Sequence, residues 1–165
     1  MVQMKNILVA TDFGEAADAA LRYGRTLARS FGATLHVLHV AENVLLRNFG
    51  GDGYTAIMPN LQQNLEEAAR KELDELLIDN DRPALRTKGV LLTSNTPALA
   101  IVDYAKSASI DLIVTGTHGR GGMAHLLMGS VAERVVRMAP CPVLTVHHPE
   151  HEFVLPDALT ATARA

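Results

Sequence analysis

The sequence predicts an α/β fold, a single three-layer α/β/α domain in which helices cover both faces of a five-stranded, mainly parallel sheet. The length of 165 residues suits one domain, because a single core typically organises about 100 to 200 residues. Five short apolar runs alternate with segments of helical spacing, as in parallel strands joined by crossover helices. Hydrophobic residues make up 48% and aromatic residues only 4%, so the core of this sheet should be aliphatic.

Five apolar runs bounded by turn residues are the predicted strands. They are Ile7 to Ala10, Leu35 to Val40, Val90 to Leu92, Leu112 to Val114 and Val143 to Val146. Ligands of open parallel sheets bind outside the carboxyl ends of the strands, where the strand order reverses. Residues at the ends of these runs are therefore the first candidates for a binding site.

The first two helices are predicted between the first three strands. The first carries apolar residues at helical spacing from Ala17 to Phe31 and ends at Gly32, since glycine readily adopts the left-handed conformation that follows a helix. The second runs from Leu61 to Leu77. Its expected buried face consists of Leu61, Leu65, Ala68, Leu73, Leu76 and Leu77.

The last two helices are marked by their first residues. Thr96 followed by Pro97 is a favourable N-cap and first helical residue. Ser130, with Glu133 three residues later, forms a capping-box sequence and is the predicted N-cap of the fourth helix. Pro140 ends that helix.

Charge and composition exclude several classes of protein. The net charge is −3 and the chain has no Trp, so it lacks the positive surface and aromatic platforms that nucleic-acid binding uses. No apolar stretch approaches about 18 residues and the N-terminus lacks a signal-peptide pattern, so we expect a cytoplasmic protein without a nucleic-acid or membrane partner. The single cysteine, Cys141, excludes an internal disulfide. His147, His148 and His151 are expected to be solvated tail residues rather than metal ligands.

The stretch between the fourth predicted strand and the fourth helix carries the strongest functional signal. Glycines at positions 116, 119 and 129 followed by Ser130 give the spacing G-x2-G-x9-G-S. Such glycines let the backbone approach a polyphosphate and turn N–H groups inward, and the following helix adds the positive end of its dipole. His118, Arg120 and His125 are close enough in sequence to add donors or charge. We therefore expect this loop to bind ATP or a related adenine nucleotide.

Two other nucleotide motifs fit this stretch less well. Gly119, Gly121 and Ala124 match the dinucleotide fingerprint G-x-G-x-x-A, but that fingerprint normally follows the first strand and needs an acid about 20 residues later. Both conditions fail here, which disfavours a nicotinamide or flavin dehydrogenase. The sequence G-x4-G-K-[ST] is absent, so the lysine of P-loop NTPases is missing.

Asp12 and Val40 lie at the carboxyl ends of two predicted strands, at the edge where a ligand should bind. Asp12 could accept hydrogen bonds or hold a metal through water, and the alternative role is an N-cap of the first helix. Val40 could contact an adenine through its backbone and side chain, and the alternative role is ordinary core packing. Both residues are candidates for ligand contacts.

With these residues identified, the chain resembles the ATP-binding branch of the universal stress protein family over nearly all of residues 4 to 148. The resemblance is carried by Lys5 to Asp12, Ala33 to Val40, Thr115 to Gly122, Gly129 to Arg134 and Ala139 to Val146. It implies a sheet with the strand order 3-2-1-4-5, as in adenine nucleotide alpha hydrolase-like proteins. A departure is Gly14, where the family commonly has a serine.

The resemblance also implies which residues contact a nucleotide. Adenine is expected near Asp12 and Val40, ribose near Gly116, and the phosphates on the glycines and the start of the fourth helix. The full set of candidates is Ala10, Thr11, Asp12, Val40, Thr115, Gly116, His118, Gly119, Arg120, Gly129, Ser130 and Val131. The expected ligand is ATP, or ADP or AMP, with or without Mg²⁺, and no catalytic or metal-ligating residue is assigned.

The resemblance implies the extent of the domain and a homodimer, whereas the C-terminal tail and one long loop lie outside the family pattern. Residues 1–148 form the expected universal stress protein domain and residues 149–165 a flexible C-terminal tail. Residues 42–59 are either a lid or an ordinary surface loop. Because an apolar edge strand is usually covered or paired, a homodimer through Val143 to Val146 is expected.

Three functions stay open at this point. The first is an adenine-nucleotide-binding regulatory or switch protein of the stress response, in which the bound nucleotide changes partner contacts. The second is a slow ATPase or phosphotransferase, for which Asp12, His118 and Arg120 are the available groups; without a P-loop lysine or a second acid we expect slow hydrolysis at most. The third is a structural dimer or adaptor without nucleotide, against which the intact glycine motif argues.

Overall fold

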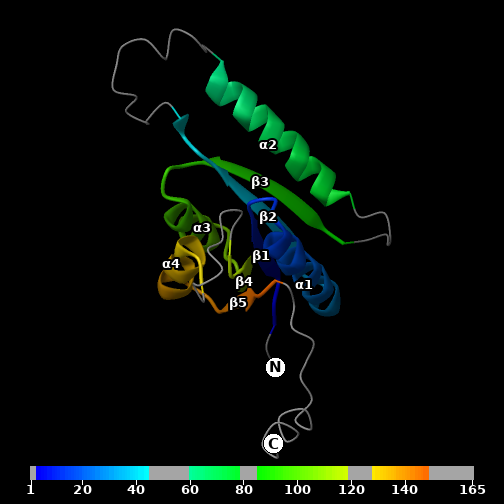
Figure 1. Ribbon diagram of the computed structural model, residues 1–165. Coiled ribbons are helices and arrows are strands. Elements are labelled where there is room, and N and C mark those ends of the chain that lie inside the picture. Colours follow the sequence, from blue (N-terminus) through cyan, green and yellow to red (C-terminus); the bar gives the residue numbers. More distant parts are fainter. Residues whose placement is uncertain (1–2, 45–59, 79–84, 119–127, 149–165) are drawn as a thin grey trace, which may run out of the picture.

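Strands and helices alternate along the chain in the predicted order. The computed structural model describes residues 3–44, 60–78, 85–118 and 128–148 (Figure 1). The elements are β1 (Asn6–Thr11), α1 (Glu15–Phe31), β2 (Thr34–Ala41), α2 (Leu61–Leu77), β3 (Thr87–Thr93), α3 (Pro97–Ser107), β4 (Leu112–Gly116), α4 (Ser130–Met138) and β5 (Val143–Val146). The five predicted strands and four predicted helices are confirmed.

All five strands are parallel and form one sheet with the order β3-β2-β1-β4-β5. The predicted fold class and strand order are therefore confirmed. The chain runs from β1 outward to β2 and β3, and then returns to the other side of β1 for β4 and β5 (Figure 1). The strand order thus reverses between β1 and β4, and a crevice at the carboxyl ends of these two strands is the expected ligand position.

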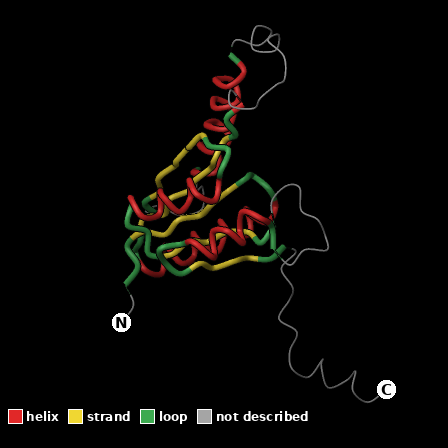
Figure 2. The backbone as a smooth tube through the Cα atoms, turned by 90° about the vertical axis from the view of Figure 1, so that its left-hand side faces the viewer, coloured by secondary structure: helices red, strands yellow, loops and turns green. Residues whose placement is uncertain are grey.

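Two apolar cores lie on the two faces of the sheet. α1 and α2 cover the face on which Ile7 and Val9 are buried, and α3 and α4 cover the face on which Leu8 and Ala10 are buried. Because successive side chains of a strand point to opposite faces, a strand between two helical layers is apolar at every position. Figures 1 and 2 show the helices on both sides of the strands, which gives the predicted three layers.

α2 buries a narrower face than the sequence predicts. Ala69 and Leu73 are its buried residues, whereas Leu65 is 42% exposed and Ala68 is also exposed. α2 packs on β2 and on the edge strand β3, so the sheet covers only a thin stripe of this helix. Ala69 shares that stripe because it lies one helical turn before Leu73, and the prediction for Leu65 and Ala68 is wrong.

A histidine is buried within β2. His36 is 6% exposed, and its Nδ1 lies 2.8 Å from the hydroxyl oxygen of Tyr104 on α3. Burial, and secondarily the charge of Lys88 at the paired position of β3, lowers the pKa of His36. As the pH falls, the unfolded chain therefore takes up a proton on this residue before the folded protein does.

We expect the free energy of unfolding to decrease as the pH falls below about 6.5, because the unfolded chain then binds a proton that the folded protein excludes from His36. This contribution is fully present above the ordinary histidine pKa and is lost on the acid side of it. In the matched variant His36→Gln, which keeps a hydrogen-bonding group for Tyr104, stability should depend less on pH in this range. Urea unfolding at about pH 7 and about pH 5 measures the difference, and equal losses in both proteins would contradict the prediction.

Candidate functional site

A cleft opens at the carboxyl ends of β1, β2 and β4, beside the first turns of α3 and α4. Its volume is about 480 Å³, which is in the usual range for small-molecule sites. The cleft lies at the reversal of strand order between β1 and β4, as expected for an open α/β sheet. Topology therefore makes it the first candidate for the functional site.

Every sequence-predicted site residue that the structure describes lines this cleft. These residues are Ala10, Thr11, Asp12, Val40, Thr115, Gly116, His118, Gly129, Ser130 and Val131. The other two, Gly119 and Arg120, lie outside the described residues, as does His125. The structure thus brings together residues that are more than 100 positions apart in the chain, while their contacts with a ligand stay a prediction.

The cleft also has lining residues that the sequence analysis did not select. They are Ala17, Leu38, His39, Pro97, Ile101, Thr117 and Ala132. Most of them belong to a strand end or to the first turns of a helix, and this position in the chain is the signal that could have identified them.

A tight turn after β1 holds Asp12 at the cleft. Asp12 Oδ1 accepts a hydrogen bond from the backbone N–H of Gly14 at 3.1 Å, and Thr11 Oγ1 accepts one from the backbone N–H of Phe13 at 3.0 Å. The N-cap of α1 is Gly14, without a side-chain cap hydrogen bond. Asp12 therefore orders the turn before α1 and does not cap the helix, which removes the alternative role considered for it.

His39 supports this turn from β2. Its Nδ1 lies 2.9 Å from the carbonyl oxygen of Thr11, and its ring lies against that of Phe13, with 4.3 Å between ring centroids. A carbonyl oxygen can only accept, so Nδ1 of His39 carries the proton of this hydrogen bond. Phe13 has a positive φ of 63°, which non-glycine residues rarely adopt. The contact with His39 thus stabilises an uncommon backbone conformation next to Asp12.

The first turn of α4 forms another wall of the cleft. The N-cap of α4 is Gly129, with φ −72° and ψ 155°, and no side-chain hydrogen bond caps the helix. The prediction of Ser130 as N-cap is therefore wrong by one residue, because Ser130 is the first residue of the helix. The first N–H groups of a helix have no acceptor within it, so those of Ser130, Val131 and Ala132 are placed to bind an acceptor in the cleft.

The end of β4 approaches α1 very closely. A Cβ atom at Gly116 would lie 2.8 Å from Cβ and 2.9 Å from the backbone carbonyl atoms of Ala16. The glycine is therefore required by packing, in addition to its place in the cleft lining. One residue later, the carbonyl oxygen of Thr117 accepts a hydrogen bond from the N–H of Gly129 at 2.7 Å, which joins the end of β4 to the start of α4.

The cleft has two chemically different ends. Over β2 and α3 its walls are mainly apolar, with Leu38, Val40, Pro97 and Ile101 beside the imidazole of His39. Over β4 and α4 they carry hydroxyl groups, an imidazole and the N–H groups of the first turn of α4. A helix N-terminus favours anions through its N–H groups and its dipole. The arrangement fits a ligand with a flat, mainly apolar group at one end and an anionic group at the other.

Comparison with known proteins places the chain in a family. The sequence model of the universal stress protein family matches residues 4–147. The chain belongs to this family. Universal stress protein A homolog 1 of Coxiella burnetii is 36% identical over 142 residues, which cover 86% of this chain and 95% of the relative.

Two solved structures show the same architecture. MJ0577 of Methanocaldococcus jannaschii has a TM-score of 0.75 at 26% identity, and the match covers 88% of this chain and 97% of that chain. A universal stress protein from Archaeoglobus fulgidus in complex with dAMP has a TM-score of 0.53 at 23% identity, and the match covers 88% of this chain and 99% of that chain. The latter similarity concerns the fold alone.

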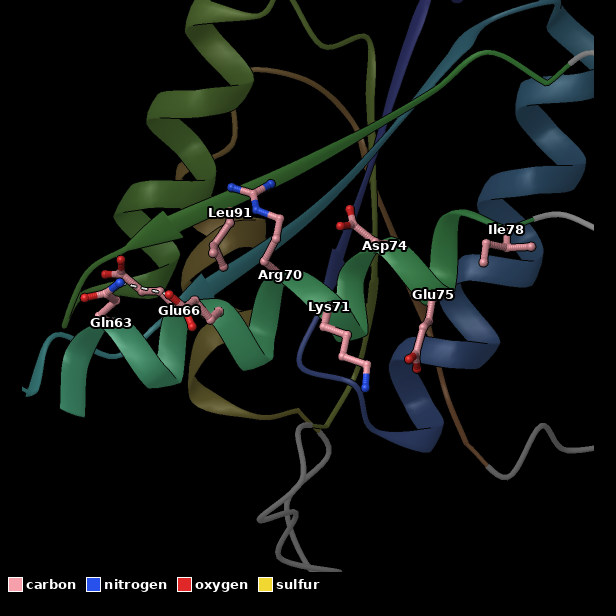
Figure 3. A pocket seen from close by; sticks show the side chains of 9 residues that line it. Gln63, Glu66, Arg70, Lys71, Asp74, Glu75, Ile78 and Leu91 are labelled. Carbon is pink, nitrogen blue, oxygen red and sulfur yellow. Dashed lines mark hydrogen bonds between the residues drawn. The ribbon is translucent and has the colours of Figure 1, made fainter. Parts of the chain in front are cut away.

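A second depression on this universal stress protein has a volume of about 710 Å³, which is larger than that of the cleft, but its lining is less suited to a small ligand. Its lining comes from the outer side of α2 and from β3 (Figure 3). Arg70, Lys71, Asp74 and Glu75 place charges of both signs along it, and Figure 3 shows these side chains projecting in different directions rather than toward one point. This is the ordinary pattern of a solvated helix face.

Other candidate groups of this universal stress protein are not arranged for chemistry. Burial, and secondarily the charge of Asp111, raises the pKa of the Cys141 thiol, which makes it a poor nucleophile. In the described parts of the chain, no three His, Cys, Asp or Glu side chains form a metal site. No helix among the described residues is long and apolar enough to cross a membrane.

Proposed function

We propose that this universal stress protein binds an adenine nucleotide in the cleft and acts as a nucleotide-dependent regulatory protein of the stress response. The main observation behind this proposal is the cleft at the reversal of strand order, which has an apolar end and a polar end. The base packs on the apolar walls near Val40 and Ile101, and the phosphates bind the first turn of α4. The Archaeoglobus fulgidus protein, which has the same fold, is in complex with dAMP, a ligand that has an aromatic base at one end and a phosphate at the other.

We further propose that the regulation depends on nucleotide occupancy rather than on rapid hydrolysis. Among the described lining residues, Asp12 is the only acid, and it is engaged by the N–H of Gly14. Efficient phosphoryl transfer needs a group that orients the attacking water and positive charge on the transition state. ATP or ADP, with Mg²⁺ bound mainly through the phosphates, therefore acts as a ligand that changes the surface offered to partners.

Isothermal titration calorimetry with ATP and Mg²⁺ tests the proposal, with CTP as the matched control for the base. We expect micromolar binding of ATP and weaker binding of CTP, because the apolar end of the cleft favours the larger purine ring. The protein must first be shown by absorbance and chromatography to carry no co-purified nucleotide. Absence of ATP binding to such a sample would contradict the proposal.

We also propose that two copies pair through β5. This strand lies at the edge of the described sheet, next to β4, and three of its four residues are half-buried. On the β4 side, the N–H of Ile113 donates to the carbonyl oxygen of Pro142, and the N–H of Thr117 donates to that of Val146. Because backbone groups alternate in direction along a strand, Thr145 directs its N–H to the free edge. This edge is available to a second copy of the chain.

Thr145→Pro is expected to convert the dimer into a monomer. Proline removes the outward N–H of residue 145, and proline is tolerated on edge strands because the lost N–H lies outside the sheet. The control Thr145→Val keeps the N–H and should stay dimeric. Sedimentation velocity measures the outcome. A wild-type monomer, or a dimer in both variants, would contradict pairing through this edge.

A further inference from the structure

A histidine at the apolar end of the cleft is held in one orientation. His39 and Thr11 occupy paired positions of β2 and β1, and Nδ1 of His39 lies 2.9 Å from the carbonyl oxygen of Thr11. The ring also lies against that of Phe13, with 4.3 Å between the centroids and 33° between the planes. The ring is therefore fixed at its attachment to β2, at Nδ1 and by its contact with Phe13, and its remaining polar atom is Nε2.

The partner of Nδ1 determines the tautomer of His39. A carbonyl oxygen has no proton to donate, so Nδ1 carries the proton, and Nε2 of the neutral ring is then an acceptor. Within the described residues Nε2 has no hydrogen-bond partner, and it is not one of the buried polar atoms that lack a partner. Since His39 is half-buried and lines the cleft, this acceptor can meet a ligand.

His118 also lines the cleft but has no defined acceptor. Its Nδ1 lies 3.1 Å from the hydroxyl oxygen of Thr117. A hydroxyl group can donate or accept, so this contact is compatible with either tautomer of the ring. The carbonyl partner is what distinguishes His39 from His118.

His147 and His148, which follow β5, are not among the described lining residues of the cleft. His147 is exposed, as predicted, and its Nδ1 lies 3.1 Å from the hydroxyl oxygen of Thr117. His148 is half-buried, with Nε2 at 3.3 Å from the carboxylate of Glu15, so its prediction as a solvated tail residue is wrong. His151 lies outside the described residues.

We propose that His39 selects adenine over guanine by accepting, at Nε2, a hydrogen bond from the amino group on C6 of the base. This inference rests on the proposed nucleotide site and deepens it. Leu38 and Val40, the neighbours of His39 in β2, belong to the apolar wall on which the base is proposed to pack. In the sheet β1 separates β2 from β4, so His39 lies at the base end of the cleft rather than at the phosphate end.

The two purines differ in the group that this acceptor would meet. Adenine carries an amino group on C6, which donates, whereas guanine carries a carbonyl oxygen there, which accepts. Nε2 of His39 gains a hydrogen bond from adenine, while guanine leaves two acceptors facing each other without a donor. Because Thr11 and Phe13 already hold the ring, little side-chain freedom is lost when the base binds.

Calorimetry with ATP and with purine riboside 5′-triphosphate, which has a hydrogen atom in place of the amino group on C6, tests the inference. At about pH 8, where an ordinary imidazole is neutral, the wild type should bind ATP about three- to tenfold more tightly than this analogue. It should also bind GTP more weakly than ATP. In His39→Asn the amide N–H can donate to Thr11 as Nδ1–H does, but the side chain is too short to reach the position of Nε2. The advantage of ATP over the analogue should fall about threefold or more in this variant.

Phe13→Leu is the matched control for a disturbed turn, because it removes the ring contact and leaves the His39 side chain intact. It should keep the wild-type ratio of the affinities for ATP and the analogue, even if both affinities fall. An unchanged ratio in His39→Asn, an equal loss of the ratio in the two variants, or equal binding of ATP and GTP by the wild type would overturn the inference alone. Failure of the wild type to bind any of these nucleotides would overturn the proposed function as well.

Long-range ¹H–¹⁵N spectra of the wild type give a test that needs no substitution. At about pH 8 His39 should be protonated on Nδ1, and its Nε2 resonance should move when ATP is added but much less when the analogue is added. A proton on Nε2 in the ATP complex, or equal shifts with the two nucleotides, would overturn the inference.

Discussion

Gly116→Val is expected to lower the free energy of unfolding by about 2–3 kcal/mol and to abolish ATP binding. The first atom of any side chain at this position would lie within 3 Å of Ala16, including its backbone carbonyl. A backbone cannot move aside as a flexible side chain can, so α1 must shift on the sheet or β4 must leave its register. Either change displaces residues on both sides of the cleft. Urea unfolding and ATP titration measure the two effects.

A second substitution identifies the crowded atoms. Ala16→Gly removes the Cβ atom that a residue-116 side chain would meet at 2.8 Å, but the carbonyl atoms at 2.9 Å stay in place. The double variant should therefore regain only part of the stability that Gly116→Val loses. Wild-type stability in Gly116→Val alone would show that the close approach of β4 and α1 does not exist in solution.

Ser130→Pro is expected to weaken ATP binding about tenfold or more while leaving α4 folded. Proline removes the N–H of residue 130, and a hydrogen bond to a charged group contributes about 1.5–3 kcal/mol. The structure favours proline at this position for two reasons. Ser130 is the first residue of α4, where proline is well tolerated, and Gly129 has a ψ of 155°, as residues before proline prefer.

Ser130→Ala is the matched control, because it removes the hydroxyl group and keeps the backbone N–H. We expect it to bind ATP more tightly than Ser130→Pro, and the difference between the two variants gives the contribution of the N–H. Circular dichroism and urea unfolding should show both variants folded. Equal affinities of Ser130→Pro and the wild type would contradict phosphate binding at the start of α4.

The fold was largely predictable because its signals are local. Apolar runs such as Ile7 to Ala10 stand out against the amphipathic helices, and their alternation requires parallel pairing. Helix ends and faces were less predictable. Ser130 with Glu133 forms a capping-box sequence, yet the glycine at residue 129 is also an accepted N-cap residue, although serine is preferred. The residues that α2 buries depend on how the helix packs on β2 and β3, and a local sequence pattern carries no information about that packing.

The same distinction applies to the candidate site. Its glycines and Ser130 form a contiguous motif, and Asp12 and Val40 follow from the rule that ligands bind at strand ends. His39 and Thr117 could not be assigned this way, because their roles depend on partners that folding brings close. His39 meets Thr11 at 28 residues' separation, and Thr117 meets His147 at 30. Hydrogen bonds of this kind exist only in the tertiary structure.

The hydrogen bond between Gly129 and Thr117 joins two walls of the cleft through backbone atoms alone. The N–H of Gly129 donates to the carbonyl oxygen of Thr117 and holds the end of β4 beside the start of α4. Backbone N–H and carbonyl groups are present whichever side chain a residue carries. Exchanges of the Thr117 side chain that keep the backbone in place can therefore change the chemistry of the cleft wall while strand and helix stay joined.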